Sequence, residues 1–165
     1  MNVKRHEGHE REIPNGHIYH AVVPIIFLTI WFLDSSLFRI STILNEYIPF
    51  AIRIILFILF LGIAFIFITL SHRTLFKSHQ PSNSLITNGI LSYVRNPMYL
   101  GFLLIYLAFI LLSISLISVG LFFVVFLIYN WMVNFEENIL ENMFGEEYTK
   151  YKEKVPKWIP YPSKK

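Results

Sequence analysis

The run PMYLGFLLIYLAFILLSISLISVGLFFVVFLIYNW, residues 97–131, decides the fold of this chain. It contains no charged side chain, and it is too long for a single membrane span of about 20 residues. Its middle is marked by three serines: Ser113, Ser115 and Ser118. We therefore predict a hairpin of two transmembrane helices, over residues 97–112 and 116–134, joined by a very short turn.

Two further apolar runs precede this hairpin, over residues 18–38 and 49–70, and we expect Pro24 to interrupt the first. Hydrophobic residues make up 55% of the chain and charged residues only 15%, with a mean hydropathy of +0.53. A soluble domain of this size carries far more charge. The composition therefore predicts a single domain over residues 1–165 with an all-α fold, a polytopic membrane bundle of about four transmembrane helices. No signal-peptide cleavage site follows the first run, which predicts a retained span.

Polar segments flank the predicted spans and indicate their orientation. Residues 1–17 form one tail, residues 71–95 form a link, and residues 135–165 form a second tail with an amphipathic helical pattern. The apolar face of that pattern comprises Ile139, Leu140, Met143 and Phe144. All lysines and arginines except Arg39 and Arg53 lie in these three segments. The positive-inside rule therefore predicts an integral membrane protein with the link and both termini in the cytoplasm.

Basic residues beside apolar spans also indicate the expected partners. The sequence pI is about 9.1, but a basic balance concentrated at membrane boundaries favours anionic lipid head groups, and we expect no nucleic acid partner. Cysteine is absent, which excludes disulfides and thiolate metal sites. The oligomeric state stays open.

The first polar motif, GILSYVRNPMYLG at residues 89–101, stands at the start of the hairpin. Asn96 is a favoured N-cap residue and Pro97 a favoured first helical residue, so a helix is expected to begin here. Its free amides and positive dipole end, with Arg95 beside them, favour an anion. Tyr99 adds a ring face and a hydroxyl. In the alternative interpretation, these residues only anchor the chain at the membrane interface.

The second polar motif places Glu136 and Glu137 at the far end of the hairpin, after the aromatic residues Tyr129, Trp131 and Phe135. Adjacent carboxylates at a membrane boundary favour a cationic partner, and aromatic rings can add cation–π attraction. The alternative is the solvated start of a surface helix. An anion site and a cation site on one membrane face suit a zwitterion such as S-adenosylmethionine.

The segments LITNGILSYVRNPMYLG (85–101) and FEENILENMFGEEYTKYKEKVPKWIP (135–160) resemble the integral-membrane methyltransferases of the isoprenylcysteine carboxyl methyltransferase and phospholipid methyltransferase superfamily. The resemblance implies S-adenosylmethionine at the cytosolic mouth of a cavity and a lipid or lipidated acceptor entering from the bilayer. It also implies the site residues. The expected catalytic residues are Arg95, Tyr99 and Glu137. The expected cofactor-binding residues are Tyr93, Arg95, Asn96, Pro97, Tyr99, Glu136 and Glu137. The F-G-x-x-Y-x-x-Y segment of the superfamily falls on Phe144, Gly145, Tyr148 and Tyr151.

Asn96 is a departure, because the superfamily pattern carries histidine at this position. Asparagine cannot take a role that needs a protonated imidazole. It can still cap a helix and form a hydrogen bond to a cofactor. A carboxylate acceptor could be oriented by Arg95 or Arg73. An amine acceptor could lose its proton to Glu137 or Tyr99. The sequence does not choose between these acceptors.

Two histidine pairs have H-x-x-H spacing, His6 with His9 and His17 with His20. Such pairs can bind zinc, but charged residues surround the first pair as on a solvated helix, and we predict no metal site. Two alternative functions remain open beside methyl transfer. One is a membrane enzyme similar to the sterol reductases, with NADPH as cofactor, and the other is a small membrane interaction protein without catalysis.

Overall fold

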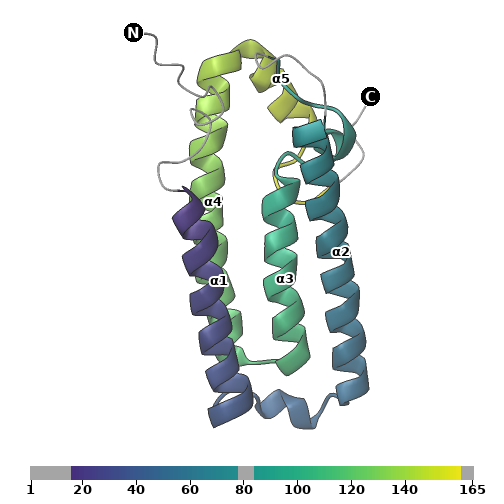
Figure 1. Ribbon diagram of the computed structural model, residues 1–165, viewed down its shortest axis with the longest axis vertical. Coiled ribbons are helices and arrows are strands. Elements are labelled where there is room, and N and C mark those ends of the chain that lie inside the picture. Colours follow the sequence, from purple (N-terminus) through teal and green to yellow (C-terminus); the bar gives the residue numbers. More distant parts are fainter. Residues whose placement is uncertain (1–15, 78–83, 161–165) are drawn as a thin grey trace.

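The computed structural model describes residues 16–77 and 84–160, and in this part of the chain all regular structure is helical. Four long helices stand side by side: α1 (Gly16–Phe32), α2 (Phe50–Lys77), α3 (Pro97–Ser113) and α4 (Leu116–Phe144) (Figure 1). Shorter elements connect or follow them: η2 (Leu33–Phe38), η3 (Ile43–Glu46), η4 (Gly89–Ser92) and α5 (Glu146–Lys154). The prediction of an all-α membrane bundle is confirmed.

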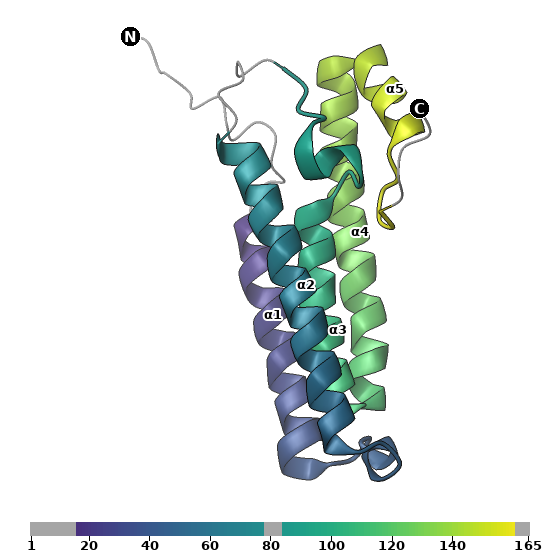
Figure 2. The same ribbon diagram turned by 90° about the vertical axis from the view of Figure 1, so that its right-hand side faces the viewer.

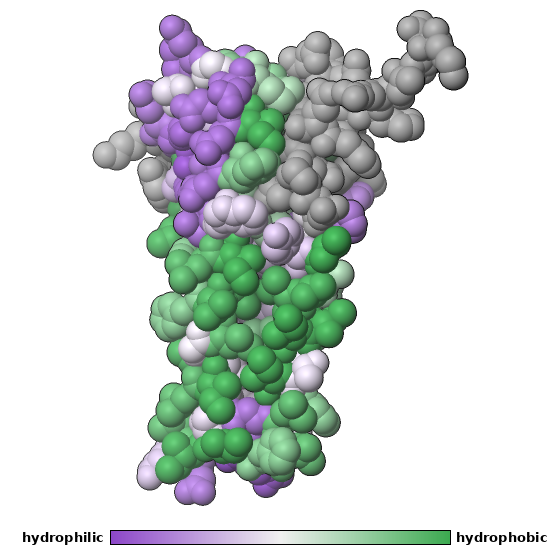
Figure 3. Space-filling view, turned by 90° about the vertical axis from the view of Figure 1, so that its left-hand side faces the viewer, coloured by the Kyte–Doolittle hydropathy of each residue, from purple (hydrophilic) through white to green (hydrophobic). Residues whose placement is uncertain are grey.

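Among the described residues, three helical segments are long and apolar enough to cross a membrane: Gly16–Phe38, Phe50–Leu75 and Leu116–Phe144. The helix α3 is apolar too but shorter, with 17 residues. On the face seen in Figure 3, a broad hydrophobic belt covers the middle of the bundle, with hydrophilic residues above and below it. Such a belt is what the hydrocarbon core of a bilayer requires of the surface it contacts.

The turn between α3 and α4 consists of Ile114 and Ser115, within the interval expected from the serines. Ile114 adopts a left-handed conformation, with φ 41° and ψ 45°, which is uncommon for a β-branched residue. Ser115 is the N-cap of α4, and its hydroxyl accepts a hydrogen bond from the amide of Ser118 at 3.0 Å. We call this end of the bundle the turn end, and the opposite end, which carries α5, the α5 end.

The expectation that Pro24 interrupts the first span is wrong, and two helices extend beyond the spans expected for them. Pro24 does not interrupt the first span, because α1 continues through it; membrane helices tolerate proline when neighbouring groups compensate the lost hydrogen bond. The helix α2 continues past residue 70 into the predicted link, as far as Lys77, since the sequence there offers no glycine or proline to end it. For the same reason α4 passes residue 134 without a break and ends at Phe144.

The helices α2 and α3 pack closely along their length (Figure 2). Gly101 allows this approach, because a Cβ atom there would lie 2.6 Å from Cγ1 of Ile68 and 3.1 Å from the carbonyl oxygen of Ala64. On its other side α3 shares a buried core with α1 and α4, which includes Phe27, Tyr106 and Met132. The helix α3 is therefore held from both sides.

A polar cluster ties the elements together at the turn end. Asp34, at the end of the first span, is buried and accepts hydrogen bonds from the amide of Ser41 at 2.9 Å and from the hydroxyls of Ser41 and Ser115. Trp31 donates from Nε1 to the hydroxyl of Ser113 at 2.8 Å. In addition, Arg53 donates from Nη1 to the carbonyl of Leu112 at 3.0 Å, which satisfies one of the last carbonyls of α3.

Candidate functional site

A cavity of about 760 Å³ lies at the α5 end of the bundle. Its wall comes from the first turns of α1 and α3, the last turns of α2 and α4, the segment before α3, and α5. The lining residues with polar or ionisable side chains are His17, His20, Ser71, Ser84, Arg95, Asn96, Tyr99, Glu136, Tyr148 and Tyr151. The two sequence motifs therefore meet at one cavity, together with residues from α1 and α2.

Asn96 occupies the N-cap position of α3, directly before Pro97, but its side chain makes no capping hydrogen bond. The expectation that its side chain caps the helix is wrong. Its Nδ2 instead donates to Oε1 of Glu137 at 3.0 Å. The carboxylate of α4 is a stronger acceptor than a neutral group, so it determines the orientation of the amide.

The side chain of Arg95, at the same end of α3, is 10% exposed. Its Nε lies 3.4 Å from Oε1 of Glu137. Its Nη1 is buried and has no hydrogen-bond partner among the residues that the structure describes. A buried N–H group without an acceptor is costly unless a ligand or water satisfies it. Because Arg95 also lines the cavity, this guanidinium is available to an anion bound there.

The two adjacent glutamates point in different directions, since neighbouring residues of an α-helix lie about 100° apart around its axis. Glu137 is 6% exposed, pairs with Arg95 and Asn96, and is not part of the cavity lining. Glu136 lines the cavity and accepts a hydrogen bond from the hydroxyl of Tyr99. The pair therefore combines one carboxylate that holds the first motif in place and one that faces the cavity.

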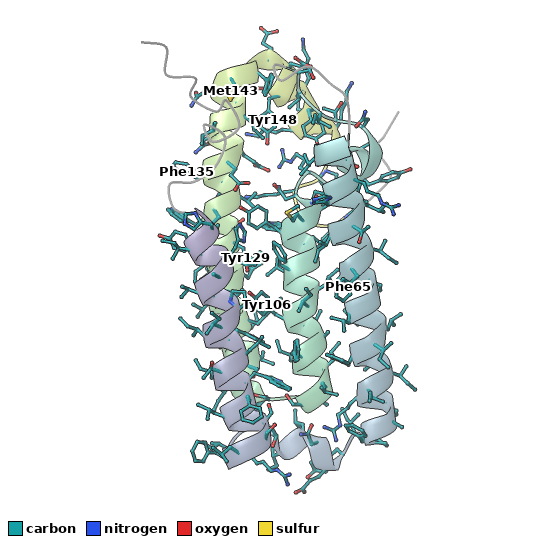
Figure 4. All side chains as sticks on the ribbon, viewed as in Figure 1. Phe65, Tyr106, Tyr129, Phe135, Met143 and Tyr148 are labelled. Carbon is teal, nitrogen blue, oxygen red and sulfur yellow. The ribbon has the colours of Figure 1, made fainter. Side chains whose placement is uncertain are left out.

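Aromatic rings continue from the cavity wall into the core of the bundle. The ring of His20 lies 5.5 Å from that of Tyr99 and 6.1 Å from that of Tyr129, measured between centroids. Deeper in the bundle, the hydroxyls of Tyr129 and Tyr106 lie 2.9 Å apart, between α4 and α3 (Figure 4). His20 was considered above only as half of a possible zinc pair. Its position in the cavity wall depends on how α1 packs against α3 and α4, which the sequence pattern did not reveal.

Two tyrosines of α5, Tyr148 and Tyr151, line the cavity. Gly145, at φ 53°, makes the sharp break between α4 and α5 that turns this helix back over the cavity. Burial raises the pKa of the Tyr148 hydroxyl above its usual range, and the charge of Glu137 adds to the effect. Burial also raises the pKa of Tyr151, whose hydroxyl donates to the carbonyl of Leu91 at 2.7 Å. Both side chains thus remain neutral hydrogen-bonding groups at physiological pH.

Some residues predicted for the site lie outside the cavity lining. Tyr93 is 53% exposed, and Arg73 is exposed on α2. No group of three or more potential metal ligands occurs within residues 16–77 and 84–160. His6 and His9 lie outside the described residues.

Comparison with known proteins supplies a family. The pattern of the phospholipid methyltransferases matches residues 51–147. A protein-S-isoprenylcysteine O-methyltransferase of Schizosaccharomyces pombe is 38% identical over 77 residues, which are 46% of this chain and 33% of that protein. A methanethiol S-methyltransferase of Bradyrhizobium diazoefficiens is 32% identical over 103 residues, which are 56% of this chain and 35% of that protein.

A third relative, an uncharacterised protein of Haemophilus influenzae, is 43% identical over 63 residues, and the match covers 38% of this chain and 100% of that protein. Both methyltransferases are much longer, so the chain spans about a third of their length. The matched family segment contains both motifs but excludes α1 and most of α5.

Proposed function

The chain belongs to the phospholipid methyltransferase family, and on that basis we propose that it transfers a methyl group from S-adenosylmethionine to a lipid or lipidated acceptor at the cytoplasmic face of a membrane. The observation that carries the proposal is the buried, unpartnered Nη1 of Arg95 at the edge of a cavity that also contains the carboxylate of Glu136. Methyltransferases among the relatives favour this reaction over the reductase and interaction-protein alternatives.

The cavity suits S-adenosylmethionine in size and charge. Its volume of about 760 Å³ lies within the usual range of ligand pockets, roughly 300 to 1,000 Å³. Arg95 and the first amides of α3 would hold the carboxylate of the amino-acid part, since a helix N-terminus favours an anion. Glu136 and the rings of Tyr99 and His20 would face its positive groups.

When bound, S-adenosylmethionine supplies a methyl group on a positively charged sulfur, which is already activated for transfer. The protein's own residues then bring the acceptor close and exclude water. For an amine acceptor, the carboxylate of Glu136 accepts the proton, directly or through the hydroxyl of Tyr99, with which it shares a hydrogen bond. A carboxylate acceptor has no proton to lose and needs only orientation.

This assignment gives the two glutamates other roles than those expected above. Glu137, expected to be catalytic, acts through other residues, because it contacts Arg95 and Asn96 and not the cavity. Glu136 is the carboxylate that contacts the ligands directly. The apolar part of the cavity wall, which includes Ala21, Leu75 and Leu140, supports the proposal that the acceptor carries a lipid.

Calorimetry on the protein purified in detergent tests the cofactor. We expect binding of S-adenosylmethionine and none of NADPH, and we expect Glu136→Gln to weaken the binding by about 1.5 to 3 kcal/mol, the usual contribution of a hydrogen bond to a charged group. Glu141→Gln is the matched control, because Glu141 lies on the same helix but pairs with Lys152 outside the cavity.

Labelled S-adenosylmethionine and lipid vesicles, followed by mass spectrometry of the products, test the reaction. A methylated lipid or lipidated peptide is the expected product. Binding of NADPH instead would point to the reductase alternative, and binding of neither compound would overturn the proposed function.

A further inference from the structure

The chain does not end at α5. Residues 155–160, which we call the C-terminal strap, leave α5 and run back beside α4 toward the middle of the bundle (Figure 2). Val155 at the start of the strap is 5% exposed and packs in a small core with Tyr148 and Tyr151. The strap lies beyond residue 147, where the match to the family pattern ends.

The strap contacts the first motif directly. The amide of Arg95 donates to the carbonyl of Pro156 at 2.9 Å, and this is a long-range backbone hydrogen bond outside any helix. The Nδ2 of Asn96 lies 3.5 Å from the carbonyl oxygen of Lys157. Two successive residues of the motif, just before α3 begins, are therefore held by two successive residues of the strap.

The strap is in turn anchored on α4 by its longest polar side chains. Lys157 donates from Nζ to Oδ1 of Asn130 at 3.0 Å and to Oδ1 of Asn134. Trp158 donates from Nε1 to Oδ1 of Asn130 at 3.3 Å, and its ring lies 5.6 Å from that of Phe126. An ammonium group that binds two amide oxygens fixes the position of the strap along the helix.

These anchors lie on the same face of α4 as Glu137. Asn130, Asn134, Glu137 and Glu141 follow one another at helical spacings of three and four residues, and so form one polar stripe. Lys157 contacts the first two, Arg95 and Asn96 contact the third, and Lys152 contacts the fourth. Glu136, which lines the cavity, lies about 100° around the helix from Glu137.

We propose that Lys157 is a positioning residue of the cofactor site: by anchoring the strap on Asn130 and Asn134, it holds Arg95 and Asn96 where their side chains meet the cavity. The inference rests on the proposed function. Without this anchor the strap keeps its contacts through Trp158 and Val155 but is held to α4 less firmly. The carbonyl of Pro156, which accepts from the amide of Arg95, is then held less firmly too.

Steady-state kinetics of methyl transfer test the role of Lys157. We expect Lys157→Met to raise the KM for S-adenosylmethionine about tenfold, as the loss of a charge-assisted anchor implies, while kcat changes much less. Lys157→Arg, which can still donate to both asparagines, should restore most of the affinity. Lys154→Met is the matched control, since it removes the same charge from an exposed position on α5.

A second variant changes the acceptor on α4 in place of the donor Lys157. Asn134→Ala should also raise the KM, and the double variant with Lys157→Met should be little worse than Lys157→Met alone, because both substitutions remove the contact between Lys157 and Asn134. This pair keeps the test informative if Lys157→Met folds poorly. Thermal unfolding of each variant without ligand shows whether it is folded.

The outcomes separate this inference from the proposed function. Parent protein that neither binds nor uses S-adenosylmethionine contradicts the proposed function. Suppose instead that the parent binds and uses S-adenosylmethionine. If Lys157→Met and Asn134→Ala then have the same KM as Lys154→Met, the positioning role of Lys157 is overturned and the proposed function is not. Additive effects of the two substitutions would also overturn that positioning role.

Discussion

The two ends of the bundle each contain a buried carboxylate surrounded by hydrogen-bond donors, yet they differ in how those donors are used. At the turn end, Asp34 accepts three hydrogen bonds from Ser41 and Ser115, and the buried hydroxyl of Ser118 is a neutral group without a partner among the described residues. At the α5 end, Glu137 forms an ion pair with Arg95 and accepts a hydrogen bond from Asn96. However, Nη1 of Arg95 and the hydroxyl of Ser71 have no partner among the described residues.

This difference separates a structural polar cluster from a binding site. A polar group buried in a membrane protein is costly to leave unsatisfied, and a charged group such as the guanidinium of Arg95 costs more than a neutral hydroxyl such as that of Ser118. The α5 end leaves buried donors beside a cavity of about 760 Å³. An incompletely satisfied cluster next to such a space is what a site for a polar ligand requires.

The largest effect is expected from breaking the ion pair at the α5 end. Arg95→Met leaves Glu137 buried without its cation, which should lower the free energy of unfolding by about 3 kcal/mol. It should also abolish the binding of S-adenosylmethionine. Chemical denaturation in detergent and calorimetry measure the two losses separately.

The double variant Arg95→Met with Glu137→Gln distinguishes the causes. It removes the uncompensated charge, so we expect much of the stability to return while binding stays lost. Recovery of binding in the double variant would contradict a direct contact between Arg95 and the ligand.

A smaller effect, on stability alone, is expected at the turn end. Asp34→Ala leaves the amide of Ser41 and two serine hydroxyls without their acceptor, which should lower the free energy of unfolding by about 2 kcal/mol. The two hydroxyls, 3.2 Å apart, can still bond to each other and limit the loss. The dissociation constant for S-adenosylmethionine should not change. Weaker binding of S-adenosylmethionine by this variant would show that the two ends are coupled.

The smallest effect is expected at Asn96. An imidazole N–H can donate to Glu137 as the amide does, so Asn96→His should stay close to the parent in cofactor affinity and turnover. Asn96→Leu removes the donor and should weaken cofactor binding by about 1.5 kcal/mol, because Arg95 then loses part of the support of Glu137. Titration of the three proteins in the same detergent gives the comparison. Equal affinity for all three would place residue 96 outside the site.

Local features of the sequence predicted local structure well. The serines at residues 113–118 placed the turn between α3 and α4, and Pro97 marked the first residue of α3, because chain-breaking and capping preferences act over a few residues. The helices α2 and α4 extend beyond the spans expected over residues 49–70 and 116–134, since polar residues do not end a helix that meets no glycine or proline.

The division of work between Glu136 and Glu137 could not be predicted in the same way. A pair of adjacent carboxylates looks symmetric in sequence, and which of them faces the cavity depends on the rotation of α4 against α3. The contribution of His20 and the path of the C-terminal strap depend likewise on contacts between distant parts of the chain. Helical spacing does align Asn130, Asn134 and Glu137, and that polar stripe was a signal available in the sequence.

The turn at Ile114 and Ser115 gives α3 and α4 a common origin from which their lengths can be measured. From there, α3 rises about 26 Å to Pro97, and α4 rises about 30 Å to Glu136, and the hydrocarbon core of a typical bilayer is about 30 Å thick. Both motifs thus stand one hydrocarbon thickness from the turn. A bilayer of another thickness is accommodated by tilting helices, which would shift the cavity relative to the lipid head groups. Acyl-chain length in the surrounding membrane then becomes a variable of the proposed reaction, in addition to the residues of the site.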